Sequence, residues 1–160
     1  MNLHEKIYIF ILILLTVIIR SPFLIKPFND EIIFYSAAVN LFENPLNLIK
    51  MPILYSYTIG LPLLLSLFFN FLGESLFTIF LFILLSDCFL IVMIYLFLRE
   101  FINTKFAFFS SLFFLFQRDI MFSGRELNPI ILSLFFLLVS IISLLKLKNK
   151  FIKSILSYFF

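Results

Sequence analysis

Two adjacent carboxylates, Asp30 and Glu31, are the first residues of this chain whose types could do chemistry. They stand in a short polar stretch between apolar runs, where a carboxylate can act as a general base toward a hydroxyl group. Asn29 before them fits a helix N-cap, so both acids also fit the first turn of a helix, where they oppose the positive end of the helix dipole. Local spacing leaves the catalytic and the structural interpretation open.

Further basic and polar residues occur in similar short stretches and could contact an anionic group. Arginine and lysine form charge-assisted hydrogen bonds with phosphate oxygens and stabilise a phosphate as it leaves. Basic residues also anchor span ends at lipid headgroups, and tyrosines there fit the interfacial aromatic belt. The residues concerned are Lys50, Tyr55, Arg118, Arg125, Glu126 and Asn128.

The segments that carry these residues are strongly apolar. Hydrophobic residues make up 63% of the 160-residue chain and charged residues 13%, which is about half the charged share of a soluble domain. The basic residues form no continuous face, so nucleic acid is not an expected partner. Cys88 is the only cysteine, which excludes an intrachain disulfide, and His4 has no metal-ligand partners. We predict a multi-pass integral protein of the plasma membrane.

Proline and glycine divide the apolar sequence into separate segments. Pro22 and Pro27 mark the end of the first span, and no small-residue cleavage site precedes them, so this span is expected to stay uncleaved. We predict an all-α, polytopic transmembrane helix bundle with residues 1–160 as a single domain. The predicted spans are about 5–25, 75–98, 106–122 and 127–145, with interfacial helices at 30–43 and 53–72 and the start of a further span at 154–160.

The lysine cluster at 146–153 sets the orientation, because basic residues favour the cytoplasmic side. Counting spans backwards then gives two alternatives. If 53–72 crosses the membrane, loop 20–52 is cytoplasmic; if 53–72 is interfacial, the N-terminus is inside and loop 20–52 is outside. Gly60 and Pro62 interrupt 53–72, which favours the second alternative, although Arg20, Lys26 and Lys50 in that loop argue against it.

Asp87 falls in the middle of the predicted span 75–98. A carboxylate at the membrane centre costs about 2.5–3.5 kcal/mol on insertion scales, so it must face a partner helix or a polar pocket, or take up a proton. We interpret Asp87 as a helix-packing residue. A transporter should carry more polar groups at this depth, which argues against that function.

The order of several short motifs resembles the N-terminal part of GT-C glycosyltransferases, most closely the family of protein O-mannosyltransferases and aminoarabinose transferases. The first span ends as in that family, an acidic motif with Tyr35 follows, and juxtamembrane and loop motifs come later in matching order. The segments that carry the resemblance are Arg20-Ser21-Pro22-Phe23, Asp30-Glu31, Lys50-Met51-Pro52-Ile53-Leu54-Tyr55, Phe71-Leu72-Gly73-Glu74-Ser75 and Arg125-Glu126-Leu127-Asn128-Pro129.

The resemblance implies an inverting transfer of a sugar from a polyprenyl-phosphate-linked donor to an extracytoplasmic hydroxyl. It implies Asp30 as the catalytic base with Glu31 assisting, and Lys50, Arg118 and Arg125 as contacts of the donor phosphate. Tyr55, Glu126 and Asn128 are the remaining candidate substrate contacts; relatives often carry an acidic residue where Asn128 stands. A divalent metal ion is compatible with this chemistry, but no metal ligand is assigned.

The resemblance also implies partners. These are a lipid-linked sugar donor, membrane lipid and, because family members contain further spans, a separate downstream chain that completes the fold. The alternative function is that of a small non-enzymatic polytopic membrane protein or a subunit of a membrane complex. The enzyme requires the acidic loop outside, whereas the alternative does not.

Overall fold

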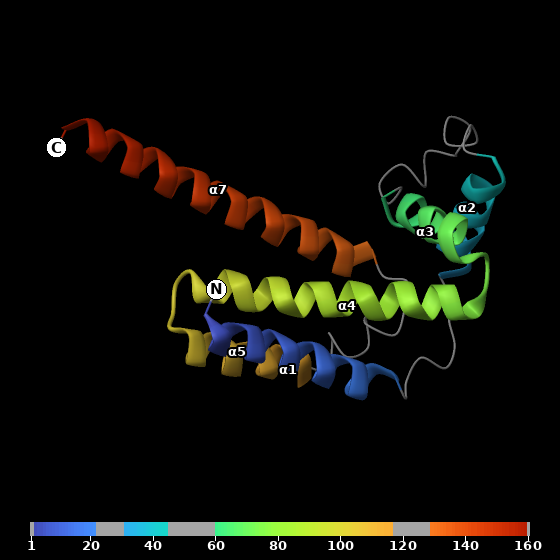
Figure 1. Ribbon diagram of the computed structural model, residues 1–160. Coiled ribbons are helices and arrows are strands. Elements are labelled where there is room, and N and C mark those ends of the chain that lie inside the picture. Colours follow the sequence, from blue (N-terminus) through green and yellow to red (C-terminus); the bar gives the residue numbers. More distant parts are fainter. Residues whose placement is uncertain (1, 22–30, 45–59, 117–128, 160) are drawn as a thin grey trace.

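The structure, a computed structural model, describes residues 2–21, 31–44, 60–116 and 129–159. Within these ranges every regular element is a helix and no strand occurs, which confirms the predicted all-α class. The helices are α1 (Leu3–Arg20), α2 (Glu31–Glu43), α3 (Gly60–Leu72), α4 (Leu76–Arg99), α5 (Thr104–Phe116) and α7 (Pro129–Phe159) (Figure 1).

Local sequence signals define the start of α4, the helix against which the others pack. Gly73 has a φ of 80°, a left-handed conformation that glycine adopts easily, and it ends α3. Ser75 then caps α4, because its hydroxyl accepts a hydrogen bond from the Thr78 amide at 3.1 Å. The 24 residues of α4 rise about 36 Å and coincide within one residue with the predicted span 75–98.

Two helices are long and apolar enough to cross a membrane, namely α4 and the stretch Pro129–Leu147 of α7. They qualify by length and composition alone, and a core helix of a soluble protein can meet the same criteria. The two helices are therefore weak evidence that the chain associates with a membrane. Large exposed side chains such as Phe77 (70%) and Phe113 (76%) agree with an apolar surrounding. α3 and α5 are apolar but shorter, with 13 residues each.

Several helix bounds differ from the predicted segments. α5 ends at Phe116, and residues 117–122 of the predicted span 106–122 lie outside the described residues. α1 ends at Arg20, where a span to about residue 25 was expected. α3 begins at Gly60, inside the predicted interfacial segment 53–72. α7 continues through 154–159, where a new span was expected, because no proline or glycine interrupts its hydrogen bonding after Pro129.

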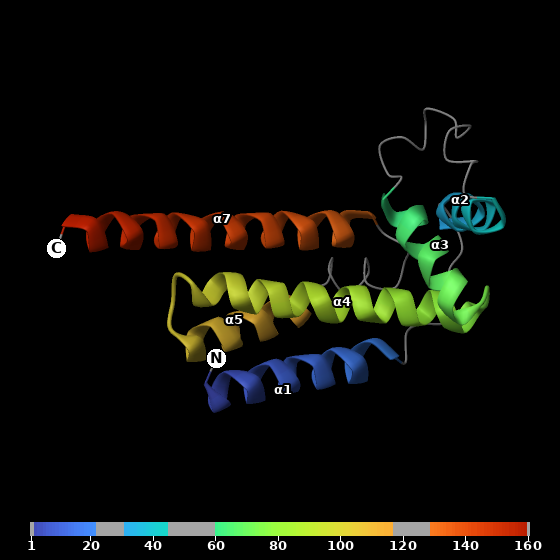
Figure 2. The same cartoon turned by 45° about the horizontal axis from the view of Figure 1, so that its top comes forward.

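Two hydrophobic clusters lie along α4. The first joins α2 and α3 to the N-terminal half of α4, and its buried members are Ala38, Leu61, Leu65, Phe69, Ile79, Phe82 and Ile83. The second joins α1 and α5 to the C-terminal half of α4, with Leu12, Ile91, Tyr95, Ala107, Phe108 and Leu115 buried. α2 and α3 therefore lie together at one end of α4, and α1 and α5 lie along the rest of it (Figures 1 and 2).

Candidate functional site

Glu31 is the only predicted site residue within the described ranges, where it is the first residue of α2. The other predicted site residues lie outside the described residues: Asp30, Lys50, Tyr55, Arg118, Arg125, Glu126 and Asn128. The structure therefore describes the helices that flank the predicted site.

Tyr35 ties α2 to the turn between α3 and α4. Its hydroxyl donates a hydrogen bond to the Glu74 carboxylate, and the edge of its ring contacts Phe69, with ring centroids 6.2 Å apart. The hydrogen bond to Glu74, together with partial burial and the negative charge of Glu74, raises the pKa of Tyr35 above its usual value of 10.0. Tyr35 therefore keeps its proton at neutral pH and holds the helix of the acidic motif against α3.

A buried ion pair joins the end of α1 to the middle of α4. The Nε atom of Arg20 lies 3.0 Å from Oδ2 of Asp87, and the two side chains are 2% and 3% exposed. Asp87 stands on α4 between Ile83 of the first hydrophobic cluster and Ile91 of the second. The pair thus lies between two apolar clusters, where charges interact more strongly than in water.

A second ion pair joins the opposite end of α1 to the end of α4. Nη1 of Arg99 lies 3.0 Å from Oε2 of Glu5, and the same carboxylate oxygen accepts a hydrogen bond from the Asn2 amide at 3.0 Å. Glu100 lies 3.9 Å from the other Arg99 nitrogen. Because Glu5 pairs with Arg99 and Arg20 with Asp87, α1 and α4 are antiparallel.

The sequence predicted that Asp87 requires a partner but did not identify Arg20. It placed Arg20 at the membrane exit of a span, whereas the structure pairs it with a residue near the midpoint of α4. The available signal was the combination of one carboxylate in the middle of a span with an arginine at the end of an otherwise apolar run. The expectation that Asp87 serves helix packing is confirmed by its contact with α1.

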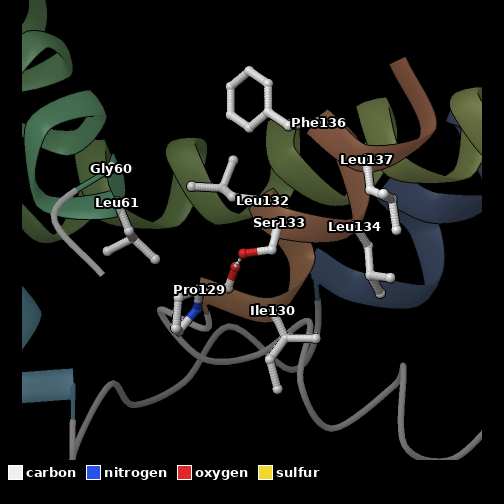
Figure 3. A pocket seen from close by; sticks show the side chains of 9 residues that line it. All are labelled: Gly60, Leu61, Pro129, Ile130, Leu132, Ser133, Leu134, Phe136 and Leu137. Atoms are coloured by element: carbon white, nitrogen blue, oxygen red, sulfur yellow. Dashed lines mark hydrogen bonds between the residues drawn. The ribbon is translucent and has the colours of Figure 1, made fainter. Parts of the chain in front are cut away.

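An apolar groove of about 520 Å³ lies between the start of α3 and the first turns of α7 (Figure 3). Ser133 is the hydroxyl-bearing residue among those that line the groove. Its hydroxyl donates a hydrogen bond to the Pro129 carbonyl of the same helix at 2.8 Å. The groove can accommodate an apolar chain, and its lining among the described residues includes no charged side chain. Its lining residues are Gly60, Leu61, Pro129, Ile130, Leu132, Ser133, Leu134, Phe136 and Leu137.

Metal-ligating side chains do not gather in threes or more within the part of the chain that the structure describes. No family model, curated protein or solved structure matches the chain. Inferences about function therefore depend on the residues and their geometry.

Proposed function

We propose that the chain is part of a polytopic membrane glycosyltransferase with a GT-C-like fold. It transfers a sugar from a polyprenyl-phosphate-linked donor to a hydroxyl group on the extracytoplasmic side of the plasma membrane. Asp30 takes the proton of the acceptor hydroxyl and Glu31 assists. Lys50, Arg118 and Arg125 stabilise the departing lipid phosphate.

The observation that carries this proposal is the separation of two ends of the molecule. The Glu5–Arg99 pair brings the N-terminus to the C-terminal end of α4. α2, which begins at Glu31, packs on α3, and α3 in turn packs against the N-terminal half of α4. If α4 crosses the membrane, helix α2 and the N-terminus belong to opposite sides. This arrangement supports a cytoplasmic N-terminus and an acidic motif on the outer side.

The basic residues are compatible with that orientation. Arg99 and Lys105 lie at the turn between α4 and α5, on the side of the N-terminus, and short cytoplasmic loops are enriched in such residues. The apolar groove near Gly60 opens beside the same α3 that packs on α2, which suits the apolar tail of a polyprenyl donor.

The reaction follows from the chemistry of the donor. The acceptor oxygen forms a bond with the anomeric carbon while the bond between that carbon and the phosphate oxygen breaks, which inverts the configuration of the sugar. The proton of the acceptor passes to the carboxylate of Asp30, and the electron pair leaves with the lipid phosphate. General-base assistance of this kind contributes about 10²- to 10⁴-fold in rate.

The test compares Asp30→Asn with Glu43→Gln, an exposed carboxylate at the other end of α2. Membranes containing the chain, with any downstream partner chain, receive polyprenyl-phosphate mannose, and the release of polyprenyl phosphate is measured. We expect Asp30→Asn to lower the release at least 100-fold, while Glu43→Gln retains the parent rate.

Equal rates for both variants would contradict the role of Asp30. A parent chain with no release from mannose, glucose or aminoarabinose donors would instead favour a non-enzymatic membrane subunit.

A further inference from the structure

α1 is a poor membrane span when taken alone. Its 18 residues are enough to qualify as a span, but they include three charged residues, Glu5, Lys6 and Arg20, and α1 is not among the helices that qualify. α4 qualifies on the same criteria although it contains Asp87. The helix that carries an arginine at its end thus packs beside the helix that carries a carboxylate at its centre.

The two buried charges compensate each other. Arg20 and Asp87 are 2% and 3% exposed and lie 3.0 Å apart, so each neutralises the other within the apolar contact of α1 and α4. On insertion scales, an arginine at the membrane centre lowers the insertion equilibrium by about 70- to 400-fold. The neutral pair avoids most of this penalty.

The second ion pair fixes how α1 lies on α4. Arg99 is twelve residues, about 18 Å, beyond Asp87 along α4, and Glu5 is fifteen residues, about 22 Å, before Arg20 along α1. The two spacings match closely enough for both pairs to form in one antiparallel arrangement, with Leu12 buried against α4 between them. A shift of α1 by one helical turn would break both pairs.

We infer that Asp87 is an intramembrane counter-ion of Arg20 and that its charge allows α1 to enter the membrane. α1 is then inserted as the partner of α4 and not independently. The inference rests on the membrane placement in the proposed function, but not on glycosyl transfer. Its experiment therefore measures insertion and not activity.

The experiment uses a Cys88→Ala background with one reporter cysteine at a time. Leu14→Cys reports on the outer surface of α1, where Leu14 is 46% exposed, and Phe89→Cys reports on α4, where Phe89 is 56% exposed. Permeabilised cells are treated with a water-soluble maleimide that does not enter lipid. In the parent, both reporters are expected to be protected.

Asp87→Leu should raise the labelling of Leu14→Cys at least tenfold and leave Phe89→Cys protected. Ser86→Ala is the matched control, because the Ser86 hydroxyl donates only to the Phe82 carbonyl of its own helix, at 2.8 Å. The double variant Arg20→Leu/Asp87→Leu should restore protection of Leu14→Cys, since an apolar pair of similar size can replace a buried ion pair.

Protection of Leu14→Cys in Asp87→Leu would overturn the inference, because α1 would then enter without the counter-ion. Equal labelling of the single and the double variant would also overturn it, since the effect would then belong to the shape of residue 87. Labelling of Phe89→Cys in the parent would overturn the membrane placement itself.

Discussion

Two ion pairs join the same two helices at the same distance, but they differ in burial. Arg20 and Asp87 are 2% and 3% exposed, whereas Arg99 and Glu5 are 23% and 13% exposed, and both pairs measure 3.0 Å. Attraction between charges strengthens as the local dielectric constant falls, and so does the penalty for taking each charge out of water. The distance therefore does not determine what either pair contributes; its surroundings do.

The two pairs should accordingly respond in different ways to the loss of one partner. A buried charge that loses its counter-charge cannot be solvated in place, whereas a partly exposed charge can turn toward water. The inner pair, Arg20–Asp87, must then be intact for α1 to pack on α4. The outer pair, Arg99–Glu5, adjusts the alignment of helices that are already packed.

The largest expected effect is that of Asp87→Leu. We expect this change to lower the unfolding free energy by about 3–5 kcal/mol, because it leaves the Arg20 charge buried without the carboxylate. Arg20→Leu should have a smaller effect, since a carboxyl group can take up a proton and become neutral while a guanidinium group stays charged. Reversible unfolding in detergent micelles measures both.

The double variant Arg20→Leu/Asp87→Leu is the control for this prediction. It should unfold close to the parent free energy, because apolar replacement of a buried ion pair is often neutral or stabilising. If Asp87→Leu lost no more stability than Glu5→Leu, the contrast between the inner and the outer pair would be refuted.

Tyr95 separates the two ion pairs on α4 and gives the next prediction. Its side chain is fully buried, and its hydroxyl has no hydrogen-bond partner among the described residues. Tyr95→Phe removes this unsatisfied group and keeps the ring, so we expect the unfolding free energy to stay the same or rise by about 1 kcal/mol. A loss of 2 kcal/mol or more would mean that the hydroxyl binds a group such as a buried water.

The sequence predicted the helices better than it predicted their partners. The bounds of α4 follow from signals within a few residues, namely Gly73, the cap at Ser75 and the apolar run up to Arg99, so they agree with the predicted span. The partner of Asp87 is 67 residues away in the sequence, and no local pattern specifies it. The length of an apolar run placed Arg20 at a membrane exit, but contact with α4 determines its environment.

The candidate site was predicted from motifs whose order resembles a family and not from packing. Such motifs name residue types for a reaction but do not state which side chains meet. Of the acidic motif, Glu31 and Tyr35 fall within the described ranges, and so does the motif Phe71-Leu72-Gly73-Glu74-Ser75. The hydrogen bond from Tyr35 to Glu74 was not anticipated, because Glu74 belongs to a different motif of the sequence analysis.

A smaller effect is expected at the outer ion pair. Glu5→Gln keeps the acceptor for the Asn2 amide but removes the charge opposite Arg99. We expect a loss of about 0.2–1 kcal/mol at low ionic strength, which should shrink further in 0.5 M salt because exposed pairs are screened. Glu100→Gln, whose carboxylate lies farther from Arg99 at 3.9 Å, should lose less. A salt-independent loss above 2 kcal/mol would show that the outer pair behaves like the inner one.

The smallest effect should come from Tyr35, whose polar contact joins α2 to the α3–α4 turn at a more exposed place. Tyr35→Phe removes the hydrogen bond to Glu74 and should lower the thermal midpoint slightly at pH 8.

The raised pKa of Tyr35 fixes the sign of the pH dependence. The contribution is fully present below about pH 10, the unfolded value, and is lost as the pH rises through the higher folded pKa. The midpoints of parent and variant should therefore converge as the pH is raised above 10. Equal midpoints of parent and variant at pH 8 would show that the ring contact with Phe69, which both retain, and not the hydrogen bond, holds α2 in place.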